Sequence, residues 1–238
     1  TPATTTLASI GATVQLTAAP VDANGHPVAG QTVSWSSSDA TNTIVTVSGT
    51  GLVTAVGNGG PVTMTATVGT KTGTATVTVA QVVASVTITT QPGTPVQSGV
   101  TFTTVPVVTV KDALNSGVAN QAVAVSAATG SALTFTNGTA TTNASGVATF
   151  NGLSATGVIG ARTLRFTAAT VQSPASNSVT FTAGVPAAVA ISTQPAATAQ
   201  SGVVFSTAPV VTVTDGSGNL VPSQAVTVSV GTGSALAF

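Results

Sequence analysis

The sequence has 238 residues and contains no cysteine, no tyrosine and no glutamate, with four aspartates and one histidine. A chain without cysteine must hold its core together without disulfides. Acid–base catalysis needs paired carboxylates or a histidine with an orienting partner, and this inventory is almost empty of both. We therefore expect no catalytic, cofactor-binding or metal-binding residues, no cofactor, and no enzymatic activity.

Charge is equally scarce, because charged residues make up only 3% of the chain and the formal net charge is zero. Soluble domains typically contain about 25% charged residues. Four basic residues cannot form the basic face that nucleic acid binding requires, so nucleic acid is excluded as a partner. A surface with so few charges does little to repel its neighbours, which suits packing into an assembly.

Long apolar runs are also missing, although 42% of the residues are hydrophobic and can build cores. No run of 18 or more apolar residues occurs, so we expect no membrane span in this chain. No segment shows a helical period of 3.6 over helical length. The first residues, Thr1-Pro2-Ala3, are neither a signal peptide nor a start methionine, so we expect a processed or partial chain.

What is present is one pattern that occurs three times, led by Asp22, Asp112 and Asp215. Each aspartate is followed six residues later by a valine, three further on by a glutamine, and then by alternating apolar residues. A mostly apolar run precedes each aspartate and a turn rich in glycine and asparagine follows it, which predicts a strand, a connection and a second strand. Repetition at intervals of 90 and 103 residues indicates an array of similar domains.

The repeats predict three domains, at residues 1–82, 83–185 and 186–238. The third copies the second at an offset of 103 and stops at Phe238, in the middle of a sandwich. We expect its strands at 210–213 and 226–230 to expose apolar side chains. Either the chain continues past Phe238 or strands of a partner complete the domain. The short apolar linker at 81–85 predicts a stiff junction.

Short alternating runs separated by glycine, asparagine and proline predict an all-β fold of tandem antiparallel β-sandwiches, the third incomplete. In the first domain the expected strands are residues 14–16, 33–35, 44–47, 52–56, 62–68 and 74–79. In the second they are residues 86–90, 102–110, 122–127, 132–136, 146–151, 163–168 and 178–182.

The first domain resembles the bacterial immunoglobulin-like domain of group 2. The resemblance rests on Asp-Ala-Asn-Gly at 22–25, Val-Ser-Trp-Ser-Ser-Ser-Asp at 33–39 and Gly-Leu-Val-Thr-Ala-Val-Gly at 51–57, and it covers essentially all of residues 1–80. One departure is at residues 42–47, which are a residue or two longer than the usual pattern. The resemblance implies an immunoglobulin-like sandwich.

The other two domains resemble the bacterial immunoglobulin-like repeats of invasin- and intimin-type adhesins, through Asn-Ala-Ser-Gly-Val-Ala-Thr-Phe at 143–150 and Leu-Arg-Phe-Thr-Ala at 164–168. These resemblances imply a non-enzymatic, extracellular array on a bacterial cell surface: a stalk, a fibre or a surface-layer component. The implied partners are copies of itself or other cell-surface proteins, with a glycan or host surface as an alternative. The competing functions are an adhesin or glycan-binding arm and accessory domains of a phage particle or secreted enzyme.

Few residues remain as candidates for a site. The three turn aspartates predict Asx-type hydrogen bonds to the turn backbone. One carboxylate per domain cannot supply the six to eight oxygens of a calcium site, although a weak carbonyl-dominated site at a junction stays open. His26 is expected as an exposed turn residue. Trp35 is expected to fill the core between the sheets, with a ligand platform as the alternative. Most phenylalanines are expected in the core: 102, 135, 150, 166, 181, 205 and 238.

Overall fold

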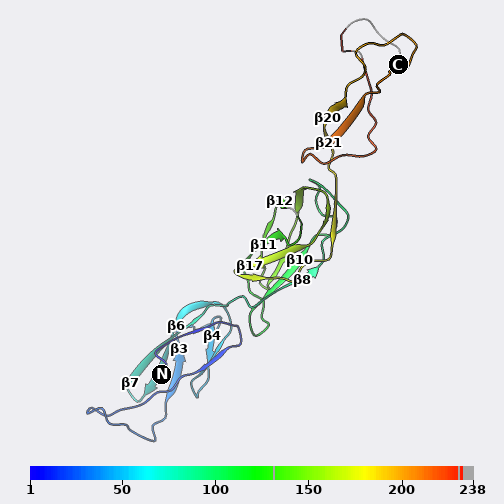
Figure 1. Ribbon diagram of the computed structural model, residues 1–238. Coiled ribbons are helices and arrows are strands. Elements are labelled where there is room, and N and C mark those ends of the chain that lie inside the picture. The colour runs from blue at the N-terminus through cyan, green and yellow to red at the C-terminus, as the bar shows by residue number, and fades with distance from the viewer. Residues whose placement is uncertain (131, 230, 233–238) are drawn as a thin grey trace.

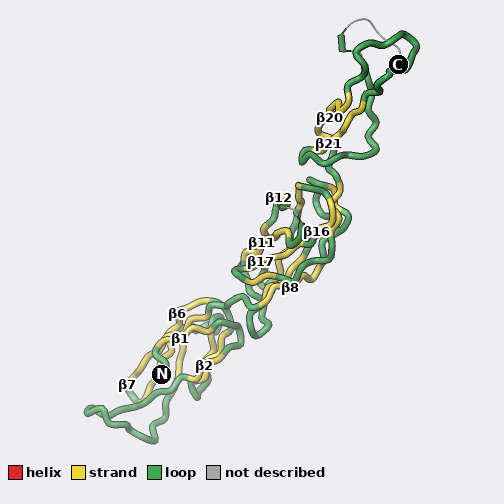
Figure 2. Tube along the Cα trace, viewed as in Figure 1, coloured by secondary structure: helices red, strands yellow, loops and turns green. Residues whose placement is uncertain are grey.

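The computed structural model describes residues 1–130, 132–229 and 231–232. Over these residues the chain forms 21 strands and no helix, and the strands follow one another in three units placed end to end (Figure 1, Figure 2). The predicted fold class, tandem immunoglobulin-like antiparallel β-sandwiches with an incomplete third, is confirmed. The described part of the chain holds no helix that is long and apolar enough to cross a membrane. We call residues 1–82, 83–185 and 186–238 the N-terminal, central and C-terminal segments.

The N-terminal segment packs two sheets against each other, with strand orders β1-β7-β6-β3 and β2-β5-β4. In β6, Val62, Met64 and Ala66 are buried while the threonines between them face outward, as the two-residue period of a strand requires. One pairing, β1 with β7, is parallel. The strands are β1 (Thr4–Leu7), β2 (Thr13–Gln15), β3 (Ser34–Ser37), β4 (Val45–Val47), β5 (Leu52–Ala55), β6 (Gly59–Val68) and β7 (Lys71–Val79).

The central segment has a larger core that contains four buried phenylalanines. Phe150 and Phe166 stack edge to face at 4.8 Å between ring centroids, and Phe102 and Phe181 do so at 6.1 Å. Its strands are β8 (Ser85–Thr90), β9 (Val96–Gln97), β10 (Val107–Lys111), β11 (Ala122–Ala127), β12 (Leu133–Thr136), β13 (Thr139–Thr141), β14 (Val147–Thr149), β15 (Ser154–Gly157), β16 (Gly160–Arg162), β17 (Leu164–Ala168), β18 (Val171–Gln172) and β19 (Val179–Thr182).

The described strands of the central segment form four sheets. The strand orders are β14-β10-β8, β13-β11-β17-β18, β12-β15 and β16-β19-β9. β9 and β19 pair in parallel and all the other pairs are antiparallel. The turn after β10 faces the N-terminal segment, since Asp112 at its start bonds to Ile10.

The predicted strands up to residue 182 are observed with their ends within three residues, with one exception. The expected strand at 102–110 begins only at Val107. Pro106 has no N–H to donate to a ladder, and the chain bends at residues 103–104 before it. Phe102 is nevertheless buried in the central core, and its N–H donates a hydrogen bond to the carbonyl oxygen of Leu153 in the same segment.

The described part of the C-terminal segment contains one hairpin of two strands, β20 (Pro186–Thr193) and β21 (Val210–Asp215). The strand predicted at 226–230 is wrong over residues 226–229, which form no strand. Its counterpart β11 is held between β13 and β17, and the described part of this segment has no strands in those places. Apolar side chains are exposed as expected, with Val210 at 50% and Val228 at 67%.

The prediction that Phe205 is in the core is wrong, and the prediction for Phe238 lies outside the described residues. Phe205 is 43% exposed, not buried, because the strands that cover its counterpart Phe102 in the central segment have no equivalent in the described part of the C-terminal segment. Phe135 is half-buried against the central core. Phe238, Val230 and the expected match of residues 234–236 to 131–133 lie outside the described residues.

Candidate functional site

The three repeated aspartates build the same turn. In each copy Oδ1 accepts hydrogen bonds from the backbone N–H groups two and four residues further on, which confirms the predicted Asx-type bonding. The donors are the N–H groups of Asn24 and His26, of Leu114 and Ser116, and of Ser217 and Asn219, at 2.8–3.0 Å. The structure does not bring the three carboxylates together, since each stays in its own segment.

The second carboxylate oxygen distinguishes the copies. Oδ2 of Asp112 accepts hydrogen bonds from the backbone N–H of Ile10 at 2.9 Å and from the side chain of Gln81 at 2.8 Å, both in the N-terminal segment. Oδ2 of Asp215 accepts one from the N–H of Gly184, the penultimate residue of the central segment, at 2.8 Å. Asp112 and Asp215 are therefore buried at the two junctions.

Asp22 lies at the outer end of the N-terminal segment and has no such neighbour among the described residues. Its Oδ2 contacts only Nδ1 of His26, at 3.4 Å, and both side chains are exposed, at 43% and 76%. The prediction that His26 is an exposed turn residue is confirmed.

Hydrogen bonds hold the pKa of several carboxyls low. For Asp215, burial acts to raise the pKa, but bonds from Asn219 and Gly184 outweigh it and lower the pKa to about 2. For Asp39, the backbone N–H groups of Ile44 and Val45 lower the pKa to about 2. The ordinary value is 3.8, so both carboxylates stay ionised far into the acid range.

These shifts predict an acid-sensitive fold. A carboxyl whose pKa is lower when folded stabilises the folded state fully above its unfolded pKa, and this contribution is lost as the pH falls toward the folded pKa. We expect the thermal midpoint to fall between about pH 4 and pH 2. Among the described residues the only ion pair joins His26 and Asp22, so hydrogen bonds, not ion pairs, carry the effect at Asp39 and Asp215.

Circular dichroism melts at 0.5-unit pH steps would check this expectation. An Asp39→Asn variant should show a shallower fall over the same window, because one of the titrating groups is gone. A thermal midpoint that stays constant from pH 5 to pH 2 would contradict the stabilising role of the ionised Asp39 and Asp215 side chains.

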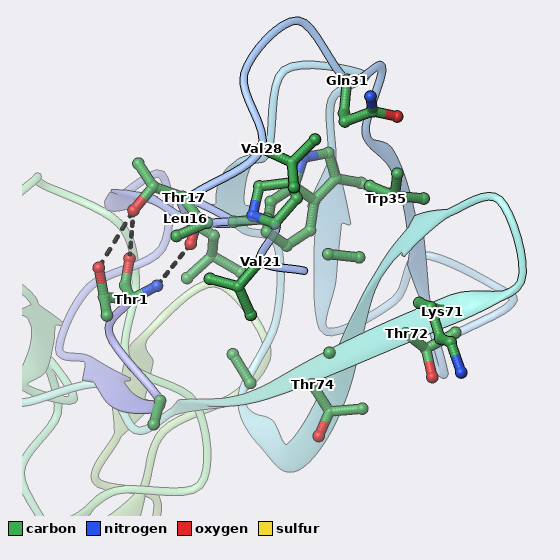
Figure 3. Close-up of a pocket in the computed structure, with 18 of the residues that line it drawn as sticks. Thr1, Leu16, Thr17, Val21, Val28, Gln31, Trp35, Lys71, Thr72 and Thr74 are labelled. Atoms are coloured by element: carbon green, nitrogen blue, oxygen red, sulfur yellow. Dashed lines mark hydrogen bonds between the residues drawn. The ribbon is translucent and has the colours of Figure 1, made fainter. Parts of the chain in front are cut away.

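A cleft of about 840 Å³ opens beside Trp35 at the outer end of the N-terminal segment (Figure 3). The loop at residues 17–28 forms one side, and strands β3, β6 and β7 form the other. Its walls are mainly apolar, and Asp22 and Lys71 are the charged residues in its lining. The described part of the chain contains no group of three metal-ligating side chains. The cleft therefore offers a mainly apolar surface that includes the flat ring of Trp35.

The core packing expected for Trp35 is observed in part, and its role as a ligand platform stays a prediction. Trp35 packs against the core of the N-terminal segment, as expected, but it is only half-buried and its side chain also lines the cleft (Figure 3). Gly51 allows this packing, since it has φ +83° and a Cβ there would lie 2.7 Å from Cε2 of Trp35. The loop at residues 17–33 covers the ring only in part, because it forms no strand.

Three polar residues at the junctions were missed from the sequence. Gln81 is the one polar side chain at the start of the linker, and Asn219 ends the third turn. Arg162 is buried and donates to the carbonyl oxygens of Ala161 at 2.8 Å and Val158 at 3.2 Å. The sequence gives no signal that separates Arg162 from Arg165 three residues later, and its burial follows from the fold alone.

No family model and no curated protein matches this chain. Solved structures that resemble it include domains 4–9 of the surface layer protein SbsC (TM-score 0.32, 21% identity, 93% of this chain and 35% of that one). Others are invasin, a bacterial integrin-binding protein (0.40, 17%, 87% and 44%), and the Yersinia pseudotuberculosis adhesin InvE (0.38, 21%, 80% and 63%).

These similarities concern the fold, and the chain spans less than half the length of the SbsC fragment and of invasin. The group 2 resemblance of residues 1–80 remains a prediction.

Proposed function

We propose that this chain is part of a non-enzymatic structural array on the outside of a bacterial cell, as a stalk, a fibre or a surface-layer component. We take its modules to be residues 1–82, 83–185 and 186–238. The observation that supports this function is the end-to-end order of the segments, with direct hydrogen bonds at both junctions (Figure 1). Such an arrangement provides length and stiffness, which a catalytic domain does not need.

The surface chemistry supports assembly. Only 3% of the residues are charged, so neighbouring copies meet little electrostatic repulsion. The polar surface consists largely of threonine and serine hydroxyls, which hydrogen-bond without net charge. We propose copies of this chain or other cell-surface proteins as its partners, and neither nucleic acid nor a substrate.

Small-angle X-ray scattering of the purified chain tests the array. Modules of roughly 35–40 Å placed in line give a rod of about 100 Å, for which we expect a radius of gyration near 30 Å. A compact globule of this length would give about 18 Å. A value near 18 Å would overturn the proposal. Electron microscopy of native material should then show whether the chain is part of a repeating filament or lattice.

An adhesin or glycan-binding arm is the second candidate, and the cleft beside Trp35 favours it. The cleft is lined by Trp35 and by mainly apolar residues of the N-terminal segment (Figure 3). Aromatic faces commonly provide the platform in such sites. Because Trp35 is the only tryptophan, a saturable change in its emission on titration with polysaccharides would support the adhesin.

A further inference from the structure

The two oxygens of each repeated aspartate face different partners. Oδ1 always bonds within its own turn. Oδ2 of Asp112 and Asp215 bonds across to the preceding segment, while Oδ2 of Asp22 does not among the described residues. The turn itself needs only one oxygen. The second oxygen is therefore available for a separate task at the junctions.

Each junction also contains a side-chain amide that bridges the two segments. At the first, Nε2 of Gln81 donates to Oδ2 of Asp112 and to the carbonyl oxygen of Gly117. Asn58 holds Gln81 in place through two bonds, of 2.8 and 2.9 Å. The amide belongs to the preceding segment, and both of its acceptors belong to the following one.

At the second junction the amide comes from the other side. Nδ2 of Asn219 donates to Oδ2 of Asp215 at 2.9 Å and to the carbonyl oxygen of Gly157 at 2.8 Å, and its Oδ1 accepts from Ile159. Arg162 bonds the carbonyl oxygens of the loop at 158–159 and so fixes the surface that Asn219 meets. At both junctions the amide thus donates to Oδ2 of the aspartate and to a carbonyl oxygen across the junction. It comes from the preceding segment at the first junction and from the following segment at the second.

Asn143 shows that an amide alone can build the turn. Its Oδ1 accepts from the N–H groups of Ser145 and Val147 at 2.9 and 3.1 Å, two and four residues further on. Its own N–H bonds the carbonyl oxygen of Val147, as the N–H of Asp112 bonds that of Ser116. Asparagine therefore replaces the Oδ1 function of the aspartate and leaves no anionic second oxygen.

We propose that the aspartate-led turn is a docking element that fixes each module to the one before it. Oδ1 shapes the turn, and Oδ2 binds a backbone N–H of the preceding module together with a bridging carboxamide. The partner it recognises is the end of another module of this type, which presents one backbone N–H, and a carboxamide from either of the two modules bridges the contact. The inference rests on the proposed array only in treating the segments as joined modules, and it is the same for a stalk and for an adhesin arm.

The full chain with Asp112→Asn, compared with Asp22→Asn, tests this docking element. Both variants keep the Oδ1 bonds, but only the first removes a carboxylate that bonds to another segment. We expect the Ile10 amide to exchange with deuterium about tenfold faster or more in Asp112→Asn, because a hydrogen bond to a charged acceptor is lost. Asp22→Asn should leave Ile10 unchanged. Asp215→Asn should affect the Gly184 amide in the same way.

The Phe166 amide, which bonds Ser173 within the central core, reports whether the central core of each variant is folded. Unchanged Ile10 exchange in Asp112→Asn would overturn the docking role, and so would an equal acceleration in Asp22→Asn. This readout is independent of the radius of gyration of the unaltered chain. A compact parent would contradict the array, whereas a protected Ile10 amide in Asp112→Asn would contradict only the docking element.

Discussion

Replacing Phe102 by alanine should lower the free energy of unfolding by about 4 kcal/mol, and the same change at Phe205 should alter it by less than about 0.5 kcal/mol. The two residues occupy the same position of the repeat, 103 residues apart. Phe102 is 4% exposed and its ring meets that of Phe181 edge to face, so its removal leaves a cavity in the central core. Phe205 is 43% exposed, so replacing it by alanine removes little buried apolar surface.

Chemical denaturation followed by circular dichroism would measure both changes, and Phe205→Ala serves as the matched control. A second control, Phe102→Leu, retains most of the buried area and should cost roughly 1 kcal/mol. A large loss for Phe205→Ala would mean that the C-terminal segment has a packed core of its own around this residue. A small loss for Phe102→Ala would contradict the central core described above.

The sequence predicts local features well because local spacing determines them. The Asx bonds of Asp22, Asp112 and Asp215 involve residues only two and four positions away, so the repeated pattern is sufficient to find them. Which oxygen of the carboxylate meets another segment depends on how the segments dock. Neither Ile10 nor Gly184 can be identified as a partner from the sequence pattern.

The strands were predicted where a strand is buried on one face, because alternation of apolar residues then reports its two-residue period. Strands β1, β9, β13, β15, β16 and β18 were missed, because strands of two to four residues are too short to show alternation. β1 and β9 are also edge strands that pair in parallel with the last strand of their own segment. The strand expected at 226–230 has the right alternation, but the described part of the C-terminal segment offers residues 226–229 no neighbouring strand to pair with. Alternation therefore shows what a segment could form, and pairing decides whether it does.

Trp35→Ala should lower the free energy of unfolding by about 3 kcal/mol, at the low end of the range for a large aromatic residue. The ring packs against the core of the N-terminal segment, and Gly51 leaves room for it, so its loss creates a cavity. The cost stays at the low end because the residue is only half-buried and one side of it faces the cleft. Val28→Ala is the matched control, since Val28 lines the same cleft and is 37% exposed, and it should change the stability by less than about 0.5 kcal/mol.

Tryptophan emission separates the two roles of Trp35 without any substitution. A ring packed against the core should emit at shorter wavelength than free indole in water, and its open side should let iodide quench it in part. Emission like that of free indole, together with an unchanged midpoint for Trp35→Ala, would place the ring on the surface and leave the cleft as its only role. Strong packing with no access for iodide would remove the ligand platform, and with it the observation that favours an adhesin over a structural array.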